Sequence, residues 1–106
     1  MTRENRCALV NGDNFVYCRQ KFPIEEYEIT PHAIIGALSK ARAADFAGGT
    51  AYVTAYPCAT CAKALAAAHI KRIVYRNEND QDDGLIASQV LNHFGIEVVR
   101  NPEIDL

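Results

Sequence analysis

The strongest constraint on this chain is a pair of cysteines three residues apart, in the segment Pro57-Cys58-Ala59-Thr60-Cys61. At a turn from a strand into a helix, this spacing lets both sulfur atoms face one point. A histidine, His32, lies upstream at the expected start of another helix. Two thiolates and one imidazole form a donor set that suits zinc. Structural zinc sites usually have four protein ligands, whereas catalytic sites have three and keep one position for water. Because no fourth ligand is evident, the pattern favours a catalytic zinc site.

A Cys-x-x-Cys motif alone also fits a redox-active dithiol, because such motifs lower thiol pKa values. Thioredoxin-like proteins usually carry the motif after an early strand and near a tryptophan, and this chain has no tryptophan. Pro57 directly before the motif, His32 upstream and the apolar run from Ile70 to Tyr75 downstream all favour zinc over redox chemistry.

Composition indicates one globular domain over residues 1–106, with 49% apolar residues to form a core. The net charge of −2 disfavours a protein that grips long nucleic acid, because phosphate contacts need a basic surface. A small nucleotide remains possible as a ligand. No apolar run approaches the ~20 residues that cross a bilayer, and the N-terminus lacks a signal-peptide core. We therefore expect a cytoplasmic protein in which Cys7 and Cys18 are buried thiols.

The hydrophobic pattern predicts the order β-β-α-β-α-β-α-β. Asn11-Gly12 is a strong hairpin signal between the first two strands. Thr30-Pro31 is typical of a helix start, and Gly48-Gly49 of its end. The last predicted helix has an apolar side. The predicted strands are 6–10, 15–19, 51–54, 72–75 and 96–99, the predicted helices are 30–47, 58–68 and 84–94, and the apolar side of the last helix comprises Leu85, Ile86, Val90, Leu91 and Phe94.

The segments Thr30-Pro31-His32-Ala33 and Pro57-Cys58-Ala59-Thr60-Cys61-Ala62-Lys63, with Ala51–Thr54 and Ile70–Tyr75, resemble the zinc-dependent cytidine and deoxycytidylate (dCMP) deaminases. The resemblance implies an α/β, three-layer cytidine-deaminase-like fold with a mixed sheet of about five strands. Members usually begin with a helix, and this chain has only about six residues before Cys7. Part of the sheet would then lie bare. Because exposed apolar patches mark interfaces, we expect a homo-oligomer.

The resemblance also implies roles for individual residues. His32, Cys58 and Cys61 would bind Zn²⁺, which lowers the pKa of a water that attacks C4 of cytosine. The substrate would be a small-molecule pyrimidine nucleotide of the dCMP type. The backbone amide of Ala33 would meet the pyrimidine 2-carbonyl, while Ala55 and Tyr56 would line the pocket, with Tyr56 as a stacking surface.

One position departs from the family pattern. The acid–base glutamate of the family should stand two residues after His32, and this chain has Ile34 there. An isoleucine carries no proton, so we expect catalysis to be impaired, whereas zinc binding should survive because that glutamate is not a ligand. Three explanations remain open: a disabled form of a real deaminase, a pseudoenzyme that kept the pocket for binding, or a replacement carboxylate such as Glu28.

Other functional readings also remain open. One is a deaminase of another cytosine or adenine substrate, including a base within RNA, and the other is a zinc-stabilised binding or assembly module without chemistry. Arg19, Lys21 and Arg76 are candidates for a 5′-phosphate contact, although solvated surface charge is the simpler account. We expect His69 to be a turn residue at the end of a helix and not a ligand.

Overall fold

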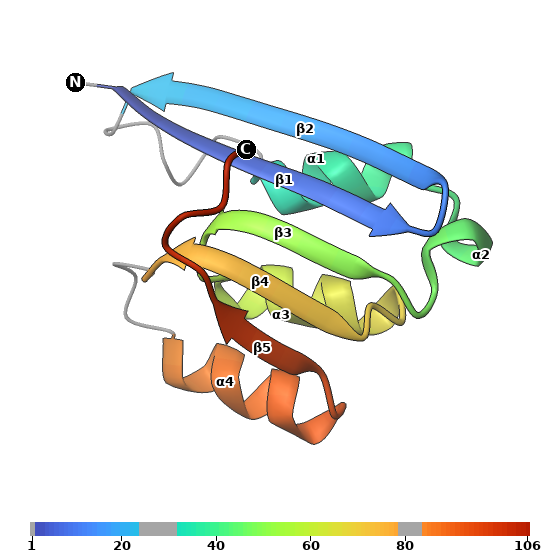
Figure 1. Cartoon of the computed structure of the whole chain (residues 1–106). Coiled ribbons are helices and arrows are strands. Elements are labelled where there is room, and N and C mark those ends of the chain that lie inside the picture. The colour runs from blue at the N-terminus through green and yellow to red at the C-terminus, as the bar shows by residue number, and fades with distance from the viewer. Residues whose placement is uncertain (1, 24–31, 79–83) are drawn as a thin grey trace.

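The computed structural model describes residues 2–23, 32–78 and 84–106. Within these ranges, five strands and four helices follow one another along the chain (Figure 1). The elements are β1 (Thr2–Asn11), β2 (Asn14–Pro23), α1 (Ala33–Lys40), α2 (Ala43–Phe46), β3 (Thr50–Ala55), α3 (Ala59–Ala67), β4 (Arg72–Asn77), α4 (Gly84–His93) and β5 (Glu97–Arg100).

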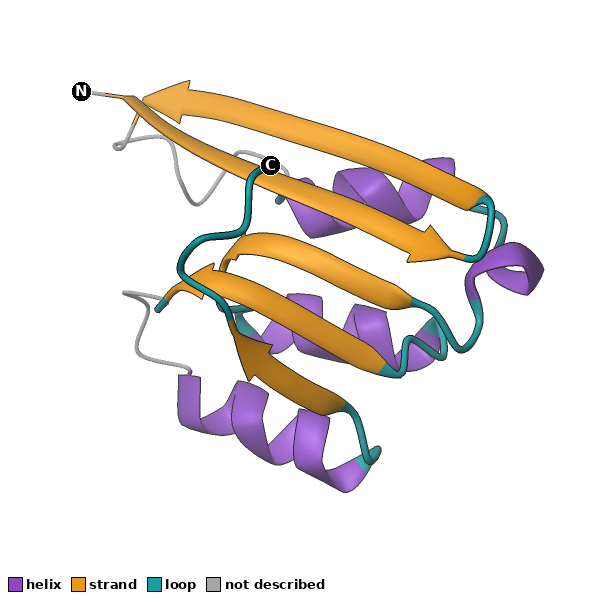
Figure 2. Ribbon diagram, in the orientation of Figure 1, coloured by secondary structure: helices purple, strands orange, loops and turns teal. Residues whose placement is uncertain are grey.

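The strands form one mixed sheet in the order β2-β1-β3-β4-β5 (Figure 2). β1 is antiparallel to both β2 and β3, whereas β3, β4 and β5 run parallel. Each parallel step passes through a helix, α3 or α4, as parallel neighbours require. The predicted α/β class, the mixed sheet and the number of strands are confirmed.

The hairpin of β1 and β2 is longer than predicted. Its turn lies at Gly12, which has the positive φ of 60° that the Asn-Gly signal indicated. Asn11 pairs with Asn14 at the turn, and the pairing continues to Thr2 opposite Pro23. β1 pairs with β3 only from Cys7 to Val10. The first half of β1 therefore extends beyond the pairing with β3.

Helices α1, α3 and α4 pack side by side on one face of the sheet (Figures 1 and 2). The strand residues that face them are buried, among them Cys7, Leu9, Val53 and Ile73. They meet the small residues of the helices, for example Ala37 at 0% exposure. Because side chains alternate along each strand, every second residue faces the helices, and these residues form the sheet side of the core.

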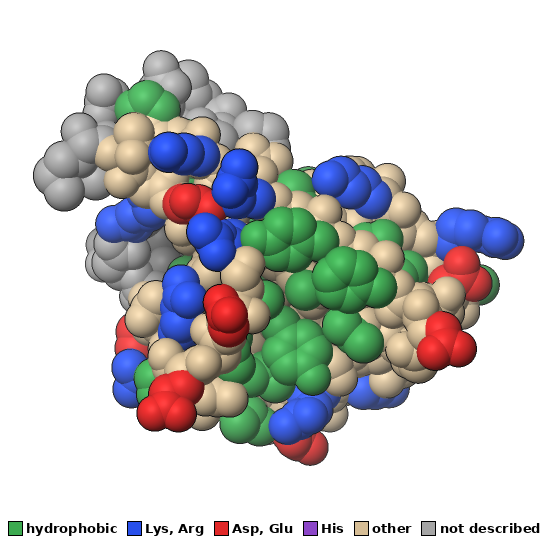
Figure 3. Space-filling view, turned by 45° about the horizontal axis from the view of Figure 1, so that its top comes forward, with side chains coloured by type: hydrophobic (Ala, Val, Ile, Leu, Met, Phe, Trp, Pro, Cys, Tyr) green, Lys and Arg blue, Asp and Glu red, His purple; other side chains and the backbone are tan. Residues whose placement is uncertain are grey.

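The opposite face of the sheet carries a row of apolar side chains across its strands. Tyr17 pairs with Ala8, Ala8 with Tyr52, Tyr52 with Val74, and Val74 with Val99. We call these five residues the outer row. No helix in the described part of the chain covers it. Figure 3 shows the apolar patch on this face. The C-terminal residues reach its edge, where the Tyr17 hydroxyl donates to the Leu106 carbonyl at 2.8 Å.

Two helices differ from the sequence-based expectation. α1 begins after His32, which is its N-cap. The predicted N-cap, Thr30, lies outside the described residues. The predicted long helix also ends at Lys40, where Ala41 is extended (φ −91°, ψ 141°), and resumes as α2. Alanines continue through this break, so helix propensity gave no sign of it.

The predicted apolar side of α4 is wrong at three positions. Leu85, Ile86 and Phe94 are 73%, 51% and 54% exposed, whereas Ala87 and Leu91 are buried. The small alanine, which was left out of the prediction, marks the true contact face. His69 follows Ala68, the C-cap of α3, and has a φ of 61°, which confirms its expected role as a turn residue. None of the helices in the described ranges is long and apolar enough to span a membrane.

Candidate active site

The predicted metal ligands come together where two helices begin. His32 is the N-cap of α1, Cys58 is the N-cap of α3, and Cys61 lies in the first turn of α3. The Nδ1 atom of His32 lies 3.0 Å from Cys61 Sγ and 3.3 Å from Cys58 Sγ. All three donor atoms lie within 4.8 Å of one another, so these residues are positioned to hold a metal ion.

The geometry and chemistry of the three donors fit zinc. Zinc–nitrogen and zinc–sulfur bonds of about 2.0 and 2.3 Å place nitrogen and sulfur about 3.5 Å apart in a tetrahedral site. The observed 3.0 and 3.3 Å are close to that separation. The Cys61 backbone N–H also donates to Cys58 Sγ at 3.4 Å, at the positive end of α3. Both the hydrogen bond and the helix end favour a thiolate at Cys58.

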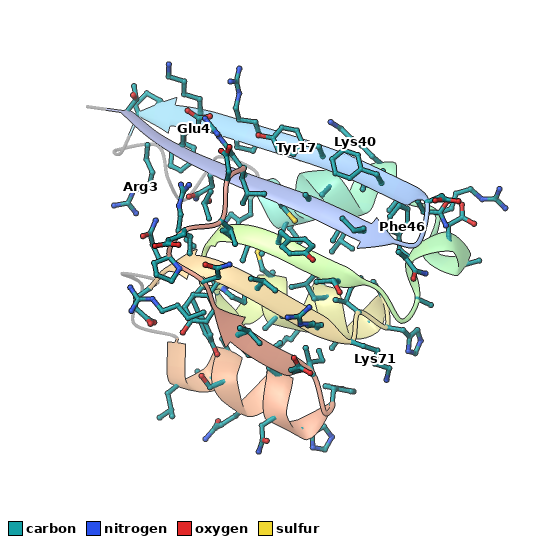
Figure 4. All side chains as sticks on the ribbon, viewed as in Figure 1. Arg3, Glu4, Tyr17, Lys40, Phe46 and Lys71 are labelled. Atoms are coloured by element: carbon teal, nitrogen blue, oxygen red, sulfur yellow. The ribbon has the colours of Figure 1, made fainter. Side chains whose placement is uncertain are left out.

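A pocket of about 50 Å³ adjoins the three donors. It opens where β1 leaves β3: at this point the Arg6 backbone N–H donates to the Thr54 hydroxyl at 3.0 Å instead of continuing the strand pairing. The protruding half of β1 brings Arg3, Asn5 and Arg6 to the pocket wall. Figure 4 shows Arg3 at this end of the sheet. The pocket is thus bordered by metal donors and by two arginine residues.

The first turn of α1 forms another wall of the pocket. Ala33 and Ile34 both line it and are 4% and 6% exposed. The backbone N–H groups in the first turn of a helix have no acceptor within the helix, so this wall presents hydrogen-bond donors. Ile34 adds only an apolar surface. Among the described residues that line the pocket, none carries a carboxylate.

Ala55 and Tyr56, the other residues predicted near a substrate, also line the pocket. The side chain of Tyr56 is held from outside the pocket: its hydroxyl lies 2.7 Å from Ser88 Oγ, and its ring meets Tyr75 edge-on. Glu28, the candidate replacement carboxylate, lies outside the described residues.

The basic residues at the pocket are not the ones that the sequence suggested. Arg19, Lys21 and Arg76 do not line it. Arg3 and Arg6 do. The unbroken run of polar residues from Thr2 to Asn5 gave no apolar pattern, so the predicted strand began only at Arg6. Arg6 Nε donates to Glu4 Oε1 at 2.7 Å. This hydrogen bond lowers the pKa of the Glu4 carboxyl, so the pair stays charged near neutral pH.

Sequence comparisons point to one family. Residues 3–77 match the model of the cytidine and deoxycytidylate deaminase zinc-binding region. The chain is 41% identical over 64 residues to the deoxycytidylate deaminase of Enterobacteria phage T4, a match that covers 56% of this chain and 30% of the relative. It is 29% identical over 73 residues to the deoxycytidylate deaminase of Homo sapiens, covering 67% and 41%. The chain therefore spans less than half the length of these curated relatives.

Structural comparison agrees with the sequence match. The dCMP deaminase of cyanophage S-TIM5, solved in complex with dCMP and dUMP, superposes with a TM-score of 0.71 over 92% of this chain and 80% of that one. Their identity of 23% makes this a likeness of fold. Because the family model covers well over half of the sequence, ligand residues and pocket included, the chain belongs to the zinc-dependent cytidine and deoxycytidylate deaminase family.

Proposed function

We propose that this protein binds a cytosine nucleotide of the dCMP type in the pocket beside a zinc ion, and that Ile34 leaves it impaired in hydrolytic deamination. The observation that carries the proposal is the joint position of the three metal donors and the two arginines, Arg3 and Arg6, around one pocket. The donors suit zinc, and the arginines suit the phosphate of a nucleotide.

His32, Cys58 and Cys61 are the proposed zinc ligands. When bound, zinc supplies Lewis acidity that lowers the pKa of a coordinated water. The thiolates at the start of α3 and the imidazole at the start of α1 would together hold a divalent ion and compensate part of its charge. The backbone of Ala33 would donate to the pyrimidine 2-carbonyl, and Ala55 and Tyr56 would border the base.

We propose impaired deamination because Ile34 lacks a group that can transfer a proton. A positioned acid–base group typically contributes ~10²–10⁴-fold to rate. Ile34 lines the pocket and offers neither a proton nor an acceptor, and no carboxylate replaces it among the described lining residues. Burial of the apolar Ile34 side chain in the pocket wall also costs less free energy than burial of a carboxylate would.

Replacement of Ile34 tests the proposal. Ile34→Glu should convert dCMP to dUMP, and ultraviolet absorbance measures this conversion. The unaltered chain and Ile34→Gln should be slower by ~10²-fold or more. The Gln variant is the matched control, because it adds polarity and length without a titratable group. Activity in the unaltered chain would contradict the impairment, and Glu28→Gln would then test the replacement carboxylate.

Two alternatives predict other outcomes. A zinc-stabilised binding or assembly module predicts that Ile34→Glu deaminates no nucleotide in a panel of cytosine and adenine compounds. A deaminase of another substrate predicts activity of that variant on a different member of the panel, including a base within RNA. The arginines at the pocket favour a phosphorylated ligand over a free base.

The outer row supports a homo-oligomer. Its partly exposed residues and the neighbouring Phe15, which is 62% exposed, form an apolar surface on a sheet face without a helix in the described residues. The partly exposed residues are Tyr17, Tyr52 and Val99. Such surfaces are typical of interfaces. Sedimentation analysis should give a mass above the 11.7 kDa of one chain, and Tyr52→Glu should lower it. A monomer at high concentration would contradict this part of the proposal.

The proposed compartment is the cytoplasm. None of the four cysteines, all of which lie in described segments, is in a disulfide. Reduced thiols suit a reducing compartment. Export of the protein to an oxidising compartment in its native cell, measured by fractionation, would contradict this assignment.

A further inference from the structure

Tyr56 makes three different contacts with one part of the molecule. Its backbone N–H donates to the Asn77 carbonyl at the end of β4, at 2.8 Å. Its hydroxyl shares a 2.7 Å hydrogen bond with Ser88 Oγ in the middle of α4. Its ring meets the Tyr75 ring of β4 edge-on, with centroids 5.0 Å apart and an interplanar angle of 83°. Backbone, ring and hydroxyl are thus all held by β4 and α4.

These contacts lie next to the metal donors along the chain. Tyr56 follows β3, and buried Pro57 alone separates it from Cys58, the N-cap of α3. Proline fixes its own φ and restricts the residue before it. The backbone between Tyr56 and Cys58 therefore has little freedom, so a displacement of Tyr56 also displaces the Cys58 sulfur. The same tyrosine lines the pocket.

We infer that Tyr56 fastens the turn that carries Cys58 to β4 and α4, and that Ser88 is a positioning residue for the zinc site. Neither residue donates an atom to the metal. They hold the Cys58 sulfur in position beside the other two donors, so that less conformational entropy is lost when the ion binds. The inference rests on the zinc part of the proposed function and is independent of the nucleotide.

Zinc affinity of the full chain tests the inference, measured by competition with a chromophoric chelator. Tyr56→Phe and Ser88→Ala each remove one side of the hydrogen bond and should weaken zinc binding roughly three- to tenfold. That is below the 10–100-fold typical of groups bonded directly to a ligand. The double variant should bind no more weakly than the weaker single variant, because both lose the same bond. Ser88→Thr keeps a hydroxyl and should restore most of the affinity.

Tyr75→Phe is the matched control. It also removes a tyrosine hydroxyl, one that donates to Glu78 at 3.2 Å, but it keeps the ring that Tyr56 contacts. Its zinc affinity should equal that of the unaltered chain. The visible spectrum of bound Co²⁺ gives a second readout, since thiolate ligation geometry changes its bands while a simple loss of stability does not.

The outcomes separate this inference from the proposed function. If the unaltered chain takes up no zinc, the proposed function fails. If it binds zinc and both Tyr56→Phe and Ser88→Ala bind it with unchanged affinity and Co²⁺ spectrum, the positioning role is overturned. Equal weakening in Tyr75→Phe would also overturn it, because the effect would then follow from any lost hydroxyl.

Discussion

At the scale of single residues, close packing decides which positions tolerate change. Gly36 in α1 faces the sheet, and a Cβ atom there would lie 2.4 Å from Cys18 Sγ. Gly36→Ala should therefore destabilise the protein by about 1–3 kcal/mol, because the helix must move away from β2. Gly84→Ala in α4 is the control: a Cβ there meets nothing within 4 Å. Urea unfolding measures both, and equal midpoints would show that α1 has room at Gly36.

A second residue-scale prediction concerns Cys7. Burial raises the pKa of its thiol from 9.0 to about 12, and the nearby Cys18 adds to the shift. The unfolded chain loses this proton at lower pH than the folded one. The contribution of Cys7 to the unfolding free energy is therefore complete below pH 9 and is lost as the pH rises towards 12. The loss should be about 1 kcal/mol by pH 10. It is measured as the unfolding free energy against pH and compared with Cys7→Ala, in which this slope should be absent. Parallel curves would contradict the prediction.

The same scale shows what the sequence could and could not predict about the site. His32, Cys58 and Cys61 were predictable because the motif is local: two of the ligands share one helix turn, and the third caps another helix. Arg3 and Arg6 were not, because their place at the pocket depends on where β1 stops pairing with β3. Strand pairing is a long-range property that polar residues do not encode.

At the scale of elements, α4 shows the limit of periodicity. Leu85 and Leu91 looked equivalent in the sequence, but they are 73% and 1% exposed. Leu91→Ala should cost about 2–5 kcal/mol through the cavity that it leaves, whereas Leu85→Ala should cost less than about 0.5 kcal/mol. Denaturant unfolding of the two variants makes the comparison. A large effect at Leu85 would mean that the exposed side of α4 is covered in solution.

Most element types, by contrast, follow from local signals. The Asn-Gly turn, the alanine-rich α3 and the β-branched run of β4 each agree with the structure. The break between α1 and α2 does not follow from them, because alanines continue across it. There the chain turns so that Phe46 is buried at 5% exposure. Tertiary packing overrides helix propensity at this point.

At the scale of the whole molecule, the metal donors join two helices that cover different strands. α1 lies against β1 and β2, and α3 follows the parallel strand β3. Zinc bound by His32 together with Cys58 and Cys61 would link both halves of the helical layer. A ligand that binds only the folded state stabilises it by about 4 kcal/mol at a thousandfold excess over its dissociation constant. Removing zinc with a chelator should therefore lower the thermal midpoint by roughly 15–20 °C.

Two variants sharpen this last prediction. Ile34→Glu keeps all three donors, so its midpoint should fall on chelation as that of the unaltered chain does. His32→Ala removes the only donor that α1 contributes among the described residues, so chelation should change its midpoint little. Scanning calorimetry with and without chelator measures all three proteins. An unaltered chain that melts at the same temperature in both conditions would mean that the two helices are held together by packing alone, and that the three donors do not act as one zinc site.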